Sequence, residues 1–189
     1  MLKNTTRTAS SFPRKRYTIK PAAALLLCLA LFLFASPKNI AEGKPSFYVS
    51  RVVDGDTLKL SDGRRVRLIG VDTPEVHYSA KLLKDAERSR RDIAAIQELG
   101  KKAAAFTKNL CDKKEVTLEY DIEKKDRYGR TLAYVYLEDG AFLNAKILEE
   151  GYGQVMTIPP NVKYAGYFLR LQQEARKNNR GLWKKELNP

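Results

Sequence analysis

The stretch VVDGDTLKLSDGRRVRLIGVDTPE, residues 52–75, sets the expected fold of this chain. Apolar and polar side chains alternate in Thr57–Leu60 and in Arg65–Val71, as in strands that bury one face. The tetrapeptide SDGR between them, Ser61–Arg64, is typical of a hairpin turn. Phe47–Val53 has the same strand character, so the sequence predicts a meander of three strands.

The rest of the chain adds strands and helices in alternation. Two further strands are expected over Lys114–Glu123 and Arg130–Leu137. Helical spacing of apolar residues predicts helices within Ser79–Leu110, where Gly100 is expected to divide two helices, over Phe142–Leu148, and over Val162–Asn178. Five short strands with helices inserted late predict an α+β fold, an OB-like five-stranded barrel with about three helices.

The N-terminal segment, residues 1–36, is expected to direct export. It holds six basic residues and no acidic one, and its apolar run Pro21–Ala35 is shorter than the roughly 20 residues of a membrane span. Leu33 stands where a cleavage site requires a small residue, so both a cleaved signal peptide and an uncleaved membrane anchor remain open. Either one places the protein outside the cell, secreted or tethered to the surface. Residues 37–46 form a linker, and 47–189 form the folded domain.

Charge and cysteine content narrow the class of protein. The chain has 35 Lys and Arg against 22 Asp and Glu in 189 residues, and this excess favours a polyanionic partner. Cys28 lies in the apolar segment, so Cys111 has no disulfide partner within the domain. We expect Cys111 to pack as a small apolar residue and the domain to depend on its core for stability.

Four carboxylates, those of Asp54, Asp56, Asp72 and Glu75, stand at the ends of predicted strands. Asp and Gly are also ordinary turn residues, so DGD alone does not indicate a site. In a small curled sheet, however, the first and third strands approach each other and bring the two clusters together. Carboxylate and carbonyl oxygens suit a hard cation, Ca²⁺ or Mg²⁺, and the one histidine and two cysteines of the chain provide no soft-metal site.

Two arginines complete the expected constellation. Arg67 precedes Asp72 by five residues, so strict alternation would place them on opposite faces unless Gly70 forms a bulge. Arg130 opens a strand after a Tyr-Gly turn. A cation with two fixed arginines is suited to phosphoryl transfer, since all three neutralise charge on the phosphate oxygens. Glu75 is the better candidate for a base that activates water, and His77 is expected to be peripheral.

Five motifs, VVDGDTLKL, VRLIGVDTPE, AAAFTKNL, DRYGRTLAYVY and EARKNNRGLW, occur in the order and at the spacing of the staphylococcal-type thermonuclease family. The chain resembles this family from about Phe47 to Trp183. The resemblance implies an OB-like barrel with three helices and Ca²⁺-dependent hydrolysis of DNA and RNA that leaves 3′-phosphate ends. We also expect a monomer that prefers single-stranded substrates.

The resemblance assigns a role to each candidate residue. Asp56 and Asp72 correspond to Ca²⁺ ligands, together with the backbone carbonyl of Thr73, and Asp54 to an acidic support of the ion. Glu75 corresponds to the residue that activates or orients water. Arg67 and Arg130 correspond to the arginines that stabilise the transition state.

The chain departs from the family pattern at two places. It has an extra charged, helix-like stretch around Asp85–Leu99, and Thr157 and Pro159 stand where the family has two base-pocket tyrosines. Two other functions stay open at this point. A non-catalytic OB-type module would bind single strands, and a basic envelope protein would bind an anionic polymer or surface. The carboxylate set favours the nuclease, since carboxylates facing a phosphate weaken binding unless a cation intervenes.

Overall fold

The computed structural model describes residues 45–89 and 92–184. The predicted signal peptide or anchor and all but the last two residues of the predicted linker lie outside these ranges, so both stay predictions. Within the described ranges, no helix is both long enough and apolar enough to cross a membrane.

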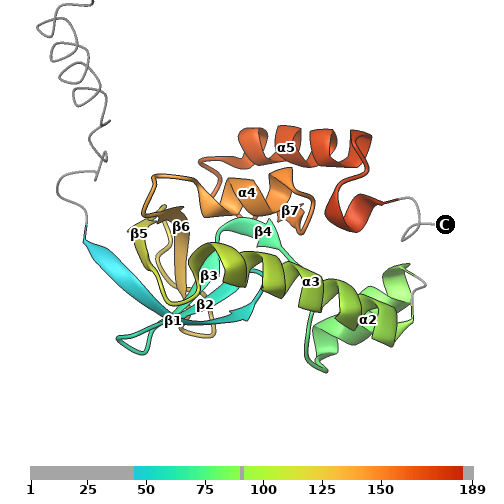
Figure 1. Ribbon diagram of the computed structural model, residues 1–189, viewed down its shortest axis with the longest axis horizontal. Coiled ribbons are helices and arrows are strands. Elements are labelled where there is room, and N and C mark those ends of the chain that lie inside the picture. The colour runs from blue at the N-terminus through green and yellow to red at the C-terminus, as the bar shows by residue number, and fades with distance from the viewer. Residues whose placement is uncertain (1–44, 90–91, 185–189) are drawn as a thin grey trace, which may run out of the picture. The chain divides into compact units, whose positions relative to one another are not determined.

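Five strands close into a barrel, as the sequence predicts. They are β1 (Ser46–Asp54), β2 (Thr57–Leu60), β3 (Arg65–Leu68), β5 (Glu115–Glu119) and β6 (Thr131–Leu137). Their order around the barrel is β1-β2-β3-β6-β5 (Figure 1). β3 and β6 pair in parallel and the other neighbours are antiparallel. This is the predicted OB-like barrel of an α+β fold.

The alternation seen in the sequence fills the barrel. On the interior, Val49, Leu58, Val66, Val116 and Val135 are fully or almost fully buried. Closure leaves no unpaired sheet edge, so these short strands need little length of their own to be stable. The first strand is also bent by register shifts against β2, which is how so small a barrel turns its corners.

Gly70 ends the third barrel strand, so the predicted strand Arg65–Val71 is in fact two strands. Gly70 has φ +79°, a conformation that favours glycine, and a Cβ on it would lie 2.6 Å from the Phe168 ring. The chain leaves the barrel there and continues as β4 (Gly70–Asp72), which pairs with β7 (Gln154–Met156). In place of the expected bulge, the strand breaks between Leu68 and Gly70, and this break redirects the chain just before Asp72.

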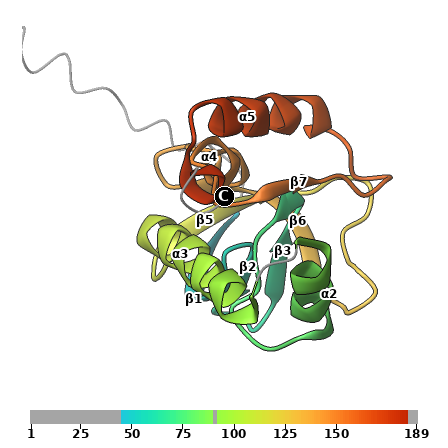
Figure 2. The same cartoon turned by 90° about the vertical axis from the view of Figure 1, so that its right-hand side faces the viewer.

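The described residues form four α-helices, one more than the expected three, and the charged stretch around Asp85–Leu99 is divided between the first two of them. α2 is Ala80–Ser89, α3 is Ile93–Cys111, α4 is Leu143–Glu149 and α5 is Ala165–Lys177. α3 packs on β1 and carries α2 beside its N-terminal half, while α4 and α5 stack on another side of the barrel (Figures 1 and 2).

Gly100 does not divide two helices as expected but lies inside α3. A Cβ there would stand 2.5 Å from the backbone oxygen of Glu75 and 2.8 Å from that of Pro74. The glycine therefore lets α3 approach the loop that carries Glu75. In the same region the amide of Gln97 donates a hydrogen bond to the carbonyl of Val76 at 3.2 Å. α3 thus fixes this loop from one side.

Asn144 and Cys111 are both buried, and they differ in what they contribute to the fold. Asn144 of α4 accepts a hydrogen bond from the Val135 amide at 2.9 Å and donates one to the Ile69 carbonyl at 2.8 Å, so it joins α4 to the point where β3 and β4 part. Cys111 is fully buried at the end of α3, as expected, and burial raises the pKa of its thiol to about 12. A thiol of this kind is inert at neutral pH.

Candidate active site

Asp56 joins the two carboxylate clusters. It follows Gly55 in the tight turn from β1 to β2 and is buried. Its Oδ2 accepts hydrogen bonds from the backbone amide of Thr73 at 2.8 Å and from the Thr73 hydroxyl at 2.9 Å. Its Oδ1 accepts one from the Thr57 hydroxyl at 3.0 Å. The DGD turn and the DTPE loop are therefore held against each other, as the curled sheet predicts.

Arg67 lies buried beneath these carboxylates. Its Nη1 is 3.1 Å from Oδ2 of Asp56, and its Nη2 is 2.9 Å from Oδ1 of Asp72. Nη1 also donates to the carbonyl of Val71 at 2.6 Å. Since the chain turns at Gly70, the side chains of Arg67 and Asp72 meet although alternation along a straight strand would separate them. The fork of a guanidinium suits such a position, because it binds two carboxylates at once.

Lys81, which sequence reasoning did not single out, enters the same cluster from the first turn of α2. Its Nζ lies 2.9 Å from Oδ1 of Asp72, 2.9 Å from the carbonyl oxygen of Thr73, and 3.0 Å from Oε1 of Glu75. Burial by itself would lower the pKa of the ammonium, but the charge and hydrogen bond of Asp72, with the charges of Asp56 and Glu75, raise it on balance. The chain has 35 Lys and Arg, and the only sequence signal that could have identified Lys81 as a site residue is its nearness to DTPE.

Asp54 has a buried carboxylate oxygen, Oδ1, with no hydrogen-bond partner in the described part of the chain. Burial raises the pKa of this carboxyl, as do the negative charges of Asp56 and Glu75, while His77 and Lys81 oppose the rise. Asp56, Glu75 and Lys81 are themselves part of the candidate site, so Asp54 lies beside it. An orphaned buried oxygen is costly, and it is the kind of group that a bound ion or water satisfies. His77 itself is exposed, in keeping with a peripheral position.

Arg130 is positioned by Asp126, four residues before it. The Arg130 Nε lies 2.7 Å from Oδ2 of Asp126, and Oδ1 of Asp126 accepts from the backbone amides of Tyr128 and Arg130 at 2.9 Å each. Burial opposes charge on Asp126, but its hydrogen bonds to Arg130 and Tyr128 outweigh this and lower its pKa. The two acceptor atoms close the Tyr-Gly turn and hold the guanidinium at its end. Sequence reasoning found Arg130 but not this partner, although the spacing of the two within DRYGR was visible.

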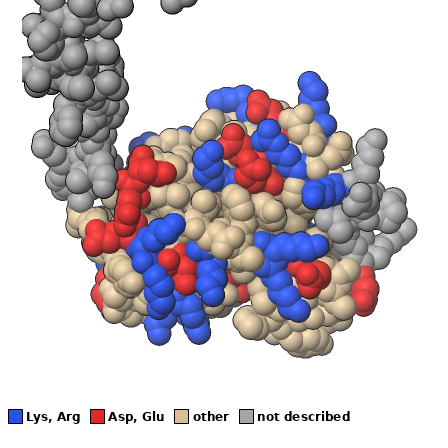
Figure 3. Space-filling view, in the orientation of Figure 1, with Lys and Arg blue, Asp and Glu red and all other residues tan. Residues whose placement is uncertain are grey.

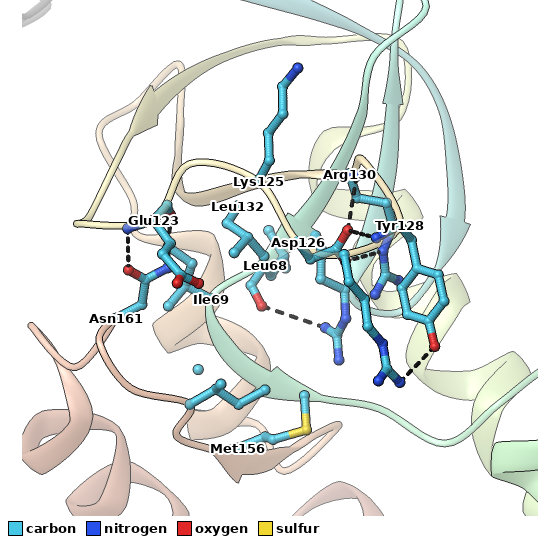
Figure 4. A pocket seen from close by; sticks show the side chains of 14 residues that line it. Leu68, Ile69, Glu123, Lys125, Asp126, Tyr128, Arg130, Leu132, Met156 and Asn161 are labelled. Carbon is cyan, nitrogen blue, oxygen red and sulfur yellow. Dashed lines mark hydrogen bonds and ion pairs between the residues drawn. The ribbon is translucent and has the colours of Figure 1, made fainter.

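Two cavities adjoin the cluster. One, of about 780 Å³, has both Arg67 and Arg130 in its wall. Figure 4 shows Arg130, Asp126 and Tyr128 along one side of this cavity and Met156 across from them. The other, of about 680 Å³, is lined by Asp72, Thr73 and Lys81. The two cavities share Arg127, Tyr128 and Met156 in their walls, so they adjoin each other.

The residues present fit a hard cation. The side chains of Asp56 and Asp72 and the carbonyl of Thr73 offer oxygen atoms alone, as Ca²⁺ prefers. An ammonium group already lies against two of these three groups, and the orphaned oxygen of Asp54 lies nearby. Within residues 45–89 and 92–184, no three His, Cys, Asp or Glu side chains form a ready metal cluster. This is consistent with a site that includes a backbone carbonyl, and with Asp56 and Asp72 being turned toward Arg67.

The structure thus brings Asp56, Arg67, Asp72, Thr73 and Glu75 into one connected group and places Arg130 on the cavity beside it. The wider surface is mixed in charge. On the face shown in Figure 3, basic side chains are interspersed with acidic ones. The charged groups of the site are buried or partly buried instead, where Arg67 meets Asp56 and Asp72 beside the two cavities.

Comparison with known proteins agrees with this geometry. Residues 65–185 match the family described as Staphylococcal nuclease homologue. The chain is 43% identical to the Thermonuclease of Staphylococcus intermedius over 143 residues, which cover 74% of this chain and 77% of that protein. It is 35% identical to the Thermonuclease of Staphylococcus hyicus over 169 residues, covering 86% and 92%. It is also 33% identical to Endonuclease YncB of Bacillus subtilis (strain 168) over 142 residues, covering 72% and 61%. The chain belongs to the staphylococcal nuclease family.

Proposed function

We propose that the protein is a calcium-dependent endonuclease that hydrolyses phosphodiester bonds of DNA and RNA and leaves 3′-phosphate ends. The observation that carries this proposal is the buried Arg67, which is ion-paired to Asp56 and Asp72 and lines a large cavity together with Arg130. The membership of a nuclease family and the printed names of its relatives support the same activity.

In this proposal the carboxylates of Asp56 and Asp72 and the carbonyl of Thr73 hold the ion. When bound, the ion would act as a Lewis acid toward a non-bridging oxygen of the phosphate. Glu75 orients a water molecule and accepts its proton as the water oxygen attacks phosphorus. The bond from phosphorus to the 5′-oxygen then breaks, the 5′-oxygen takes up a proton, and the phosphate stays on the 3′ side.

Arg67 and Arg130 donate hydrogen bonds to the phosphoryl oxygens, where negative charge grows in the transition state. Both side chains are held before substrate arrives, Arg67 by buried carboxylates and Arg130 by Asp126. Preorganised donors need little rearrangement during the reaction, and each such donor contributes about 10²–10³-fold to turnover in other enzymes. One of the two also stabilises the departing 5′-oxygen.

The cavity suits an unpaired nucleotide better than a duplex. Leu132, Met156 and Ile158 give it an apolar wall, and the exposed ring of Tyr128 stands at its side. A base displaced from a helix can stack on such surfaces, and Arg127 and Lys125 in the same lining provide charge for a backbone. Single-stranded substrates are therefore the preferred class. We further propose that the protein acts as a monomer, and that it acts outside the cell, the latter on the strength of its N-terminal segment.

A cleavage assay tests the proposal. The purified protein is incubated with single-stranded DNA and with RNA in Ca²⁺, in Mg²⁺ and in a chelator, and product ends are identified by phosphatase treatment. We expect cleavage in Ca²⁺ alone, with ends that lose a 3′-phosphate to the phosphatase. Glu75→Gln should abolish cleavage, whereas Glu98→Gln, on the exposed face of α3, should leave it unchanged. Binding without cleavage in every divalent ion would instead support a non-catalytic OB-type module.

A further inference from the structure

Lys81 binds the same oxygen atoms that the proposed ion requires. Its ammonium contacts Asp72 and the Thr73 carbonyl, both assigned as ligands, and Glu75, assigned as the base. All three contacts are between 2.9 and 3.0 Å. One ammonium has three hydrogens to donate, and here the three acceptors use all of them. The side chain therefore occupies the site as a cation would.

The backbone of α2 delivers Lys81 to this position. The Ser79 hydroxyl accepts a hydrogen bond from the Leu82 amide at 3.1 Å and so starts the helix. Leu82, the next residue after Lys81, is fully buried, and α2 packs on α3. The Cα of Lys81 is thus held in place, and any departure of the ammonium must occur by rotation within its own side chain.

Space for that departure is present. The Lys81 side chain is 34% exposed, and the cavity of about 680 Å³ that contains it extends along α2 past Lys84 and Arg88. Rotation of the long, flexible lysine chain can carry the ammonium from the carboxylates into this open region. Released into water, the ammonium recovers both its hydration and its rotamer freedom.

The charges of the site explain why a cation is needed in the absence of metal. Asp54, Asp56, Asp72 and Glu75 crowd together, and Arg67 neutralises Asp56 and Asp72 from below. Lys81 neutralises Glu75 and also contacts Asp72, which lines the cavity with it. Like charges at this separation repel strongly in a partly buried setting. An ammonium or a divalent ion relieves this repulsion, and the two would compete for the same oxygens.

We propose that Lys81 is a resident cation of the active site, and that a divalent ion enters only when the Lys81 ammonium leaves Asp72, the Thr73 carbonyl and Glu75. The inference rests on the metal site of the proposed function. It assigns to α2 a direct part in setting metal affinity. A divalent ion carries twice the charge and accepts more oxygen ligands than an ammonium, so it can displace Lys81.

Metal binding to the purified protein tests the competition without reference to turnover. Lys81→Met removes the ammonium and keeps an apolar stem of similar length. Lys84→Met, on the same helix and in the lining of the same cavity, is the matched control for loss of one charge. By isothermal titration with Ca²⁺, we expect Lys81→Met to bind at least about tenfold more tightly than the wild type, within the range of ordinary couplings. Lys84→Met should differ from the wild type by less than about threefold.

A second measurement uses the wild-type chain and so does not depend on the folding of a variant. Reductive methylation with formaldehyde is followed at each lysine by mass spectrometry, with and without Ca²⁺. We expect Lys81 to react slowly in the apo protein and about fivefold faster or more with saturating Ca²⁺, a change of the size that allosteric couplings produce. The rate at Lys84 should not change.

The outcomes separate the two proposals. Equal or weaker Ca²⁺ binding by Lys81→Met, or protection of Lys81 that persists in saturating Ca²⁺, overturns the resident-cation inference and leaves the calcium-dependent nuclease standing. Failure of the wild type and both variants to bind any divalent ion removes the metal site, and with it both the inference and the calcium dependence. Tighter binding and a Ca²⁺-dependent gain in Lys81 reactivity establish the competition.

Discussion

The guanidinium of Arg67 and the carboxylate of Asp72 meet at 2.9 Å across the turn at Gly70. Arg67 belongs to the barrel and Asp72 to the short ribbon of β4 and β7. This contact fixes one wall of the site relative to the other and leaves a second nitrogen of the guanidinium for Asp56. The activity and stability of the protein are expected to depend on contacts of this kind, between side chains on different strands and helices.

Arg67→Lys should lower turnover by about 10²–10³-fold, because an ammonium cannot bind Asp56, Asp72 and a phosphate oxygen at once. The exposed neighbour Arg65, on the same strand, provides the control, and Arg65→Lys should keep wild-type turnover. Steady-state kinetics on single-stranded DNA at saturating Ca²⁺ measures both. Wild-type turnover in Arg67→Lys would remove this residue from the mechanism.

Asp72→Asn should weaken Ca²⁺ binding as well as turnover, since it removes a charged ligand and one partner each of Arg67 and Lys81. We expect the dissociation constant for Ca²⁺ to rise at least about tenfold, which corresponds to about 1.4 kcal/mol. Isothermal titration gives the value directly, and the shift of Tm on adding Ca²⁺ should shrink in parallel. Asp62→Asn, on the exposed hairpin, should change neither quantity.

Gly100→Ala should destabilise the protein, although alanine is by about 1 kcal/mol the better helix former. A Cβ at this position would lie 2.5 Å from the Glu75 oxygen, so α3 or the loop must shift, at a cost of about 1–3 kcal/mol. The shift also displaces Glu75, so turnover should fall with stability.

Gly166→Ala should have the opposite effect on stability from Gly100→Ala. Gly166 lies in α5, and a Cβ there meets no atom within 4 Å. We expect it to stabilise the protein by about 0.5 kcal/mol. Urea unfolding of both variants measures the two signs, and a Gly100→Ala protein as stable as Gly166→Ala would show that α3 does not press on the loop.

Glu119→Gln should lower stability in a pH-dependent way. Burial opposes charge on Glu119, but hydrogen bonds from Lys163, Tyr164 and Tyr136 outweigh it and hold the pKa below its ordinary value of 4.5. A lowered folded-state pKa adds stability above pH 4.5, and this contribution disappears as the pH falls through the folded-state value.

Urea unfolding from pH 7 to pH 3 checks this expectation. The wild type should exceed Glu119→Gln by about 1 kcal/mol at pH 7, and the difference should vanish toward pH 3. Glu115→Gln, an exposed change on the same strand, should give a difference of less than about 0.5 kcal/mol at any pH. A gap that is constant with pH would show that the charge of Glu119 does not matter.

Local chemistry made much of the fold readable from the sequence. Period-two alternation gave the barrel strands, because each must bury one face, and the SDGR turn gave the first hairpin. The carboxylate clusters were readable because they stand at the ends of predicted strands, which a small barrel brings together, and Arg67 was readable because it precedes Asp72 in the same stretch. Gly100 was misread as a helix boundary, because its role is to allow a contact with Glu75, which is distant in sequence.

By itself, then, the sequence determined the barrel, the family pattern and the residues Asp56, Arg67, Asp72, Glu75 and Arg130, since these follow from local periodicity and motif. Only the tertiary structure decided which charges meet. The turn at Gly70 aims Arg67 at Asp72, and α2 brings Lys81 to the oxygens of DTPE. Both depend on the packing of segments on one another, and no pattern within a single segment encodes the atom-to-atom distances on which the electrostatics of the site depend.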